Sequence, residues 1–403
     1  MVMDMLRAAF RSPFGRRTVP PALRWLVAAS LAWGMGLGLY ATLWPLYVEH
    51  LGGGPSAIGW LESTSAVITA VAALPGGFWA DRVDRRRLML WGSWIATPAP
   101  LLFWWAPSWP WLFLGLALYF GSAFSAPASQ AYLQELAGAR LAVSYNLVIS
   151  GFAGGAVAGS AIGGYMAGHF GYGPVFLTAM VFYLVSTLLM LPLPSRPVPK
   201  SSREGRQRLW FRPGARLSRW TGLAAVLTFA GSLAGPYLVP YWRSVGHLSL
   251  ENIGLLGAAA TLAGAVVGPL WGRWAERRGL PDSLAAGLGL ATIGLGALWT
   301  FPRSFVVQLT GAVVRGVGGA VHALVGVAVG RLVSAADSGR AYGLLNWVTQ
   351  AAAALAPVPG AYLYRRLPTL PMVVTSGIWV LAIVFILTRP GGRWDRPGRQ
   401  PDS

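Results

Sequence analysis

The sequence has no cysteine among its 403 residues and contains only one lysine and four histidines. The absence of cysteine excludes disulfide frameworks, thiolate metal sites and cysteine nucleophiles. The histidines are His50, His169, His247 and His322. No two of them are close enough in sequence to suggest a metal pair, and Lys200 lacks the preceding glycine-rich turn of a phosphate-binding loop. We therefore expect no metal and no cofactor.

Charged residues are also scarce, at 11% of the chain, whereas soluble domains carry about 25%. Hydrophobic residues make up 55% of the chain, and there are 52 glycines and 20 tryptophans. This supply of charge is too small to cover the surface of a soluble protein, while glycine and tryptophan are common in membrane spans and at their ends. The composition excludes a soluble enzyme, a disordered chain and a fibrous protein.

The apolar residues fall in twelve runs, each about as long as a membrane-spanning helix requires. The runs cover residues 25–48, 56–80, 88–105, 109–133, 141–168, 171–193, 217–242, 250–274, 283–301, 304–332, 340–364 and 370–388. A helix pairs its own backbone polar groups, so it is the structure expected for every run in lipid. The fold class is therefore all-α integral membrane, with twelve transmembrane helices.

The net charge of +19 is distributed in short clusters between the apolar runs, which argues against nucleic-acid binding. If the N-terminus is cytoplasmic, 27 of the 32 basic residues lie in cytoplasmic segments and only four lie in the opposite loops. This bias is the positive-inside pattern. We expect a multi-pass protein of the cell inner (plasma) membrane with both termini in the cytoplasm.

A proline-rich, basic stretch divides the twelve spans into two sets of six. The expected domains are a basic cytoplasmic N-terminal tail at 1–24, a six-helix bundle at 25–193, a cytoplasmic linker at 194–216, a second six-helix bundle at 217–389 and a cytoplasmic tail at 390–403. The two halves also repeat each other at an offset of 195 to 200 residues. The matched positions are Ile58-Gly59 with Ile253-Gly254, 77–82 with 272–277, Gly121 with Gly316, and Arg140 and Asn146 with Arg340 and Asn346.

The sequence Gly-Phe-Trp-Ala-Asp-Arg at 77–82 resembles the signature between the second and third helices of the major facilitator superfamily. With twelve spans and a basic central linker, the resemblance covers the chain from about residue 25 to residue 388. It implies two pseudo-symmetric six-helix bundles, nested repeats and one central site between the bundles. It also implies a monomer.

The resemblance implies that the signature loop is a gating latch at the cytoplasmic face. Asp81 is expected near the N-terminus of the eleventh span, where the helix dipole stabilises a carboxylate. The gating motif comprises Gly77, Asp81, Arg82, Arg85, Arg86 and, in the second half, Gly272, Glu276 and Arg277. A simple positive-inside anchor is the alternative interpretation of these arginines.

The fifth span carries a glycine motif made of Gly155, Gly159, Gly163 and Gly164. It resembles the helix-5 signature of proton-driven drug exporters in the superfamily, with Ser160 where the family pattern has proline. Small residues let helices approach closely in a membrane. A generic packing face is the alternative interpretation.

Glu62 is the only acid well inside a predicted span. Acidic residues within membranes are rare and usually face an interior or an aqueous path, so Glu62 is a candidate carrier of a coupling proton. The alternative is a carboxylate near the interface that bonds Ser65 or an adjacent helix.

Arg315 lies in the middle of the tenth span, where an arginine costs about 2.5–3.5 kcal/mol on insertion scales. His322 follows two turns later on the same face of a regular helix, and the two together would favour an anionic or zwitterionic substrate. A purely structural Arg315, packed against Gly318 and backbone carbonyls, is the alternative. The remaining candidates for proton or substrate contact are Tyr40, Asn146 and Asn346.

These observations predict a secondary active transporter that moves a small organic solute by alternating access through the lipid bilayer. Proton-coupled efflux of a drug-like molecule or metabolite is favoured by the helix-5 motif. An uptake permease or uniporter for a sugar or organic acid is one alternative, and a non-transporting receptor or scaffold is another. We expect no enzyme, because the spans contain no Ser–His–acid set, no HExxH or GxSxG motif and no acid pair.

Overall fold

A computed structural model describes residues 20–80, 82–137, 141–195, 214–333 and 338–388. Within these ranges every regular element is a helix. The tails at 1–19 and 389–403, and the linker residues 196–213, lie outside the described residues, as does Asp81.

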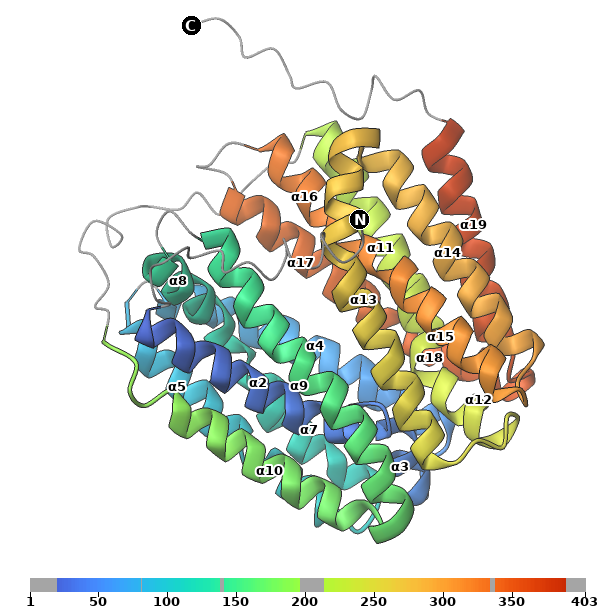
Figure 1. Cartoon of the computed structure of the whole chain (residues 1–403), viewed down its shortest axis with the longest axis horizontal. Helices are drawn as coiled ribbons and strands as arrows, with labels where there is room; N and C mark the ends of the chain where they lie inside the picture. The colour runs from blue at the N-terminus through green and yellow to red at the C-terminus, as the bar shows by residue number, and fades with distance from the viewer. Residues whose placement is uncertain (1–19, 81, 138–140, 196–213, 334–337, 389–403) are drawn as a thin grey trace, which may run out of the picture.

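The first half of the chain forms the N-terminal bundle (Figure 1, blue to green). Its elements are α2 (Pro21–Ala41), α3 (Trp44–His50), α4 (Pro55–Ala80), α5 (Arg85–Ala96), α6 (Ala99–Trp104), η1 (Trp109–Trp111), α7 (Leu112–Gly121), η2 (Ser122–Ser125), α8 (Ala126–Ala137), α9 (Leu141–Phe170) and α10 (Tyr172–Leu189).

The second half forms the C-terminal bundle (Figure 1, yellow to red). Its elements are α11 (Ala215–Ala234), η5 (Gly235–Tyr237), α12 (Leu238–Ser244), α13 (Leu250–Arg278), α14 (Leu280–Thr300), α15 (Phe305–Gly319), η6 (Ala320–His322), α16 (Ala323–Leu332), α17 (Ser338–Leu355), α18 (Pro357–Arg366) and α19 (Leu370–Thr388).

Ten helical segments within the described residues are long and apolar enough to cross a membrane. The other two predicted spans, 88–105 and 340–364, fall on the pairs α5–α6 and α17–α18. Each pair is divided beside a proline, Pro98 or Pro357, which cannot donate a backbone hydrogen bond to the preceding turn. The observed helices are thus consistent with twelve crossings, and each of these two crossings is made in two pieces.

The core of the N-terminal bundle is aromatic. The hydroxyl groups of Tyr40 and Tyr183 lie 2.9 Å apart and join α2 to α10. The Tyr40 ring also contacts the rings of Phe103 and Phe176, with centroids 5.9 and 5.5 Å away. These contacts hold α2, α6 and α10 together as one packed unit.

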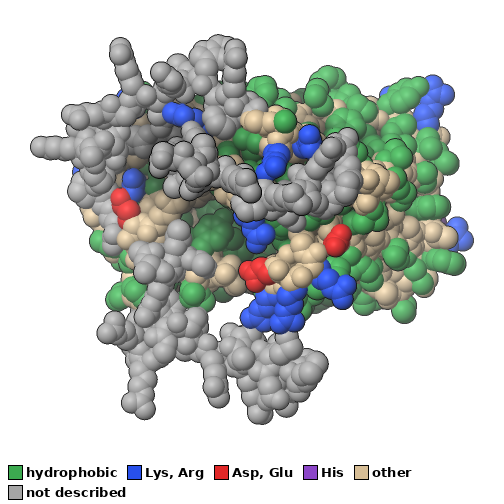
Figure 2. Space-filling model, turned by 90° about the horizontal axis from the view of Figure 1, so that it is seen from above, with side chains coloured by type: hydrophobic (Ala, Val, Ile, Leu, Met, Phe, Trp, Pro, Cys, Tyr) green, Lys and Arg blue, Asp and Glu red, His purple; other side chains and the backbone are tan. Residues whose placement is uncertain are grey.

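The two ends of the bundles differ in charge. We call the end where α2 begins and α19 ends the terminal face, and the end where α3 and α12 finish the opposite face. Arginines of the α4–α5 loop, of the end of α13 and of the end of α16 lie at the terminal face. Figure 2 views the molecule from above and shows such basic side chains gathered around the helix ends, with hydrophobic side chains over much of the surrounding surface.

Gln308 fixes the turn between α14 and α15. Its side-chain nitrogen Nε2 donates hydrogen bonds to the carbonyl oxygens of Leu298 and Phe301, each at 2.8 Å. The last carbonyls of a helix have no partner within the helix, so this buried side chain replaces the missing donors.

Replacing Gln308 with leucine is expected to lower the free energy of unfolding by about 1–2 kcal/mol, because two buried carbonyls lose their donor. The thermal unfolding midpoint of the detergent-solubilised protein would measure this loss. Thr310→Val on the same helix is the matched control, because the Thr310 side chain is exposed and bonds only the carbonyl of Val306. Equal midpoints for the two variants would contradict the expectation.

Candidate functional site

A cavity of about 570 Å³ lies between the two bundles. Both halves contribute to its wall, including Thr42, Glu62 and Phe120 from the N-terminal bundle and Pro236, Arg315 and Gln350 from the C-terminal bundle. Ligand pockets for small organic molecules have volumes of this order. The cavity is therefore the candidate functional site.

Glu62 reaches this cavity from α4, two turns after the helix begins at Pro55. Among the described residues, no hydrogen bond or ion pair to its carboxylate is found. The hydroxyl group of Ser65, the partner considered from the sequence, instead donates to the carbonyl oxygen of Leu61 at 2.7 Å. The carboxylate thus faces the cavity without a protein partner in the described part of the chain.

Arg315 reaches the same cavity from α15. Its Nε atom is buried and has no hydrogen-bond partner among the described residues. A Cβ placed on Gly318 would meet the backbone of Gly287 and Ala291 on α14, so this glycine lets α15 and α14 approach closely. No hydrogen bond from the guanidinium group to a backbone carbonyl, as the structural alternative requires, is found among the described residues.

The other candidate residues lie outside the cavity wall. The Nδ1 atom of His322 donates a 2.8 Å hydrogen bond to the carbonyl oxygen of Gly319, and the His322 ring centroid lies 6.4 Å from that of Trp379 on α19. Tyr40 belongs to the aromatic core. Asn146 is exposed in the first turns of α9, and Asn346 is exposed in the middle of α17. Glu62 and Arg315 are thus the two candidates that the structure brings to one site.

The cavity is closed toward the opposite face by a junction of α9 with α13. A Cβ placed on Gly254 would lie 2.5 Å from the carbonyl oxygen of Ser160 and 2.8 Å from the Cα atom of Gly164. The hydroxyl group of Ser160 donates a hydrogen bond to the carbonyl oxygen of Gly254 at 3.0 Å. The hydroxyl group of Thr42 lies 2.8 Å from the Ser160 hydroxyl group. Sequence reasoning missed Thr42 entirely, whereas the unusual serine at position 160 was a signal.

A second crossing, of α4 with α18, closes the cavity at the same end. A Cβ placed on Gly59 would lie 3.0 Å from the carbonyl oxygen of Pro357. The Tyr237 hydroxyl group donates to that same carbonyl at 2.5 Å. The repeated Ile-Gly pair of the sequence therefore places one glycine at each of these two crossings between the bundles.

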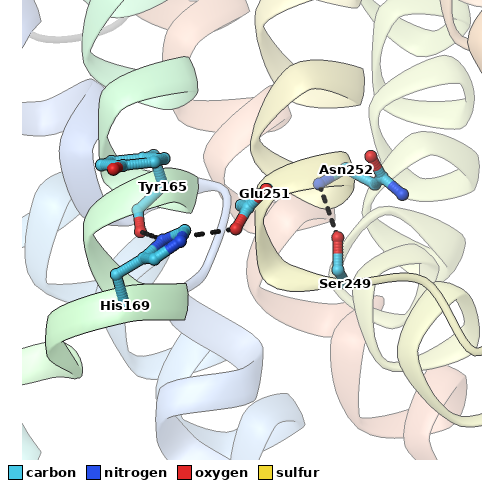
Figure 3. Close-up of polar contacts among 5 residues, drawn as sticks. All are labelled: Tyr165, His169, Ser249, Glu251 and Asn252. Atoms are coloured by element: carbon cyan, nitrogen blue, oxygen red, sulfur yellow. Dashed lines mark hydrogen bonds and ion pairs between the residues drawn. The ribbon is translucent and has the colours of Figure 1, made fainter.

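An ion-pair contact lies near the first junction. The Nδ1 atom of His169 in α9 is 3.3 Å from a carboxylate oxygen of Glu251 in α13 (Figure 3). The same nitrogen lies 3.0 Å from the carbonyl of Tyr165, and Glu251 follows the helix-capping residue Ser249. Both side chains are exposed, so the contact adds little energy and mainly marks the approach of the two bundles.

From this junction α9 and α13 diverge toward the terminal face (Figure 1). Glycines on the diverging part of α13, such as Gly268 and Gly272, have open space where a Cβ would stand. The arrangement has one closed end and one spread end.

A family model for the Major Facilitator Superfamily matches residues 25–250 and 220–402. The chain belongs to the Major Facilitator Superfamily. This confirms the predicted fold class, an all-α integral membrane protein with the superfamily fold, and the protein is a multi-pass membrane transporter.

Relatives of this chain include proteins named for multidrug resistance. The chain is 27% identical over 307 residues to multidrug resistance protein MdtG of Escherichia fergusonii, covering 71% of this chain and 74% of the relative. It is 26% identical over 354 residues to the protein of the same name from Serratia proteamaculans, covering 82% of each.

Solved superfamily structures share the fold at low identity. A nucleoside transporter, NupG, superposes with a TM-score of 0.77 at 13% identity, covering 91% of this chain and 99% of that one. A bacterial homologue of the iron transporter ferroportin in its inward-facing state gives a TM-score of 0.69 at 16% identity, covering 93% and 100%. At these identities the likeness shows the fold alone.

The superfamily signature loop is engaged within its own bundle. Arg85 pairs with Glu135 of α8, and Arg86 donates to the carbonyl of Leu191 just beyond α10. Arg82 lies over the ring of Phe78, with its guanidinium carbon 3.4 Å from the ring centroid. The arginines thus brace the terminal face of the N-terminal bundle in this state.

The other members of the predicted latch lie on two helices. Gly77 lies in the last turns of α4, while Glu276 and Arg277 are exposed near the end of α13. Asp81 lies outside the described residues, and no ion pair is found for Glu276 or Arg277 among the residues that the structure describes. The latch therefore stays a prediction.

The helix-5 glycine motif of the superfamily serves two interfaces. Gly155, Gly159 and Gly163 face α2, where a Cβ placed on each would meet the backbone at Leu31, Met35 and Leu39. Gly164 instead faces Gly254 and Leu250 of α13. Three glycines therefore build the N-terminal bundle, and one belongs to the junction between the bundles.

Proposed function

We propose that this protein is a secondary transporter of the inner membrane that exports small organic molecules in exchange for protons. The observation that carries the proposal is the central cavity with an unpartnered carboxylate, Glu62, in its wall. The cavity is closed at the opposite face by contacts that involve Gly59 and Gly254. Opening these contacts while the terminal face closes would move the cavity's access from one side to the other.

The direction of transport follows from charge and from the relatives. Basic residues concentrate on segments of the terminal face, and the positive-inside rule assigns such segments to the cytoplasm. Both termini are then cytoplasmic, and the two bundles span 25–193 and 217–389. The state described here would accept its solute from the cytoplasm. Export is the direction suggested by the relatives named for multidrug resistance.

Glu62 is the residue assigned to proton coupling. A carboxylate at membrane depth that has no fixed cation beside it can take up a proton when the cavity faces the more acidic side and release it on the other. The gating motif, including Asp81 with its neighbours, would then hold the cytoplasmic face closed in the alternate state. The transporter works as a monomer in this proposal, because each bundle pair encloses a complete cavity.

The coupling is tested with purified full-length protein in liposomes that contain a pH-sensitive dye. The probes are 1-naphthylacetate, 1-naphthylmethylammonium, 1-naphthylacetamide and methyl glucoside, with protein-free liposomes as the blank. We expect at least one probe to move protons only when protein is present. Glu62→Gln should reduce this movement at least tenfold, because the amide cannot exchange a proton.

Asp282→Asn is the matched control, because Asp282 is an exposed carboxylate in the first turn of α14. Proton movement that survives in Glu62→Gln would remove Glu62 from the mechanism. Probe uptake without any proton movement would favour the uniporter alternative. Failure of the protein to move any probe, while it stays folded, would favour a non-transporting receptor.

A further inference from the structure

The cavity wall carries two charged side chains, Glu62 and Arg315, one from each bundle. The proposed function uses Glu62 and gives Arg315 no task. Burial of a guanidinium group is unfavourable unless an anion or several hydrogen-bond acceptors satisfy it. Among the described residues, neither an acid nor a carbonyl is found at its buried Nε atom.

The helix that carries Arg315 is fixed on two sides. A Cβ placed on Gly294 of α14 would lie 2.5 Å from the backbone nitrogen of Arg315. On the other side, Gly316 packs against the carbonyl of Ala260 on α13. Because backbone meets backbone on both sides, α15 cannot rotate to carry the guanidinium out of the cavity.

Apart from the two charges, the cavity wall combines apolar residues with neutral polar residues such as Ser232, Thr261 and Gln350. Ala66, Phe120, Leu238 and Val239 contribute to its wall. A guanidinium group presents a planar fork of donors that matches a carboxylate, sulfonate or phosphate. A site that combines such a fork with apolar walls selects a molecule with an acidic group and an apolar body.

We propose that Arg315 binds the acidic group of the transported solute, so that the substrate is an amphipathic organic anion. The inference rests on the proposed function only in taking the cavity as the transport site. It adds a chemical class of substrate and assigns the binding residue. Glu62, across the same cavity, accommodates an ammonium or hydroxyl group where the solute has one, so zwitterions fall within the class.

Binding is measured by titration calorimetry on the purified full-length protein, which requires no proton coupling. The probes share one naphthyl body: 1-naphthylacetate, 1-naphthylacetamide and 1-naphthylmethylammonium. We expect 1-naphthylacetate to bind at least tenfold more tightly than 1-naphthylacetamide or 1-naphthylmethylammonium. Arg315→Gln should weaken acetate binding at least tenfold and abolish this preference, while Arg315→Lys should retain part of it because the charge remains.

Arg303→Gln is the matched control, because Arg303 is exposed in the loop between α14 and α15. The proposal is overturned if the wild-type protein binds 1-naphthylacetate and 1-naphthylacetamide equally, or if 1-naphthylacetate does not bind at millimolar concentration. It is also overturned if Arg315→Gln leaves the preference for 1-naphthylacetate intact. The first two comparisons use wild-type protein, so they hold even if the variant does not fold.

An anionic lipid headgroup has the same chemistry as an anionic solute. Dihexanoylphosphatidylglycerol is therefore included as a fourth probe. Binding of this lipid in preference to naphthylacetate, with loss in Arg315→Gln, would assign a lipid to Arg315 and overturn the solute proposal. Tighter binding of naphthylacetate supports it.

A charge measurement separates this inference from the proposed function. Export of a monoanion in exchange for one proton moves two positive charges inward per cycle, whereas a neutral solute moves one. With the membrane potential set by potassium and valinomycin, naphthylacetate transport should respond more steeply to an inside-negative potential than transport of a neutral probe. Acetate binding without proton-coupled transport would preserve the Arg315 assignment and reject only the exchange mechanism.

Discussion

Replacing Gly254 with leucine is expected to prevent closure of the opposite face and to shift the protein toward its other state. Gly254 lies where α13 crosses α9, and even a Cβ there would stand 2.5 Å from the Ser160 carbonyl oxygen. This oxygen and the Gly164 Cα atom, which would lie 2.8 Å from the Cβ, are backbone atoms and cannot move aside as a side chain can. Overpacking costs typically about 1–3 kcal/mol. The population closed at this end should therefore fall about tenfold or more.

The distance between the bundles reports this shift directly. Because the chain has no cysteine, two cysteines introduced at Phe170 and Ser249 can carry spin labels without background, and pulsed dipolar spectroscopy gives the distance between them. The distance should increase in Gly254→Leu, and transport should fall in parallel. Gly268→Leu on the same helix is the control, because a Cβ at Gly268 meets nothing within 4 Å. An unchanged distance distribution in Gly254→Leu would refute the junction as a gate.

Replacing Gly163 with valine is expected to disrupt the N-terminal bundle itself. The Cα atom of Gly163 sits against the backbone of Leu39 on α2, so a side chain at this position meets the Leu39 carbonyl at once. The helices α2 and α9 would have to separate along a contact that also includes Gly155 and Gly159. We expect a loss of about 3 kcal/mol in folding free energy and a large loss of monodisperse protein.

Size-exclusion chromatography and the thermal unfolding midpoint measure this effect in detergent. Gly154→Val is the matched control, because Gly154 is exposed on the same helix and has open space around it. Valine lowers helix propensity equally at both positions, so the difference between the variants isolates packing against α2. Equal stability of the two would show that the glycine motif is not needed for packing.

The spans could be predicted because the physics of the bilayer acts on single segments. Each apolar run had to be long enough and helical, and ten observed helices meet that demand directly. The breaks beside Pro98 and Pro357 follow from the chemistry of proline, and 3₁₀ segments also interrupt the fourth, seventh and tenth spans.

The candidate site was predictable where a charge stood in an apolar run. Glu62 and Arg315 were selected on that ground, and both line the cavity. Thr42 and Ser160 are small neutral residues, whose importance depends on the approach of α13 from the other half of the chain. Periodicity within one helix cannot reveal that approach, because it does not say which neighbour each face meets.

His322 was expected beside Arg315 because seven residues make two turns of a regular α-helix. The intervening η6 segment, Ala320–His322, has 3₁₀ geometry. A 3₁₀ turn holds 3.0 residues against 3.6, so three such residues add about 60° of rotation. This rotation accounts for the position of His322 near Trp379, away from the cavity wall.

The tightened segments have a mechanical consequence for the transport cycle. The fourth span is interrupted by η2 and the tenth by η6, at corresponding places in the two halves, and η5 interrupts the seventh. A 3₁₀ segment has poorer hydrogen-bond geometry than the α-helix on either side and is a common position for a hinge. The bundles can therefore bend at mid-membrane depth as well as rock, so that the half of each span near one face can move while the half near the other remains in place. Alternating access would then involve bending of the helices at η2, η5 and η6 as well as rotation of the two bundles as rigid bodies.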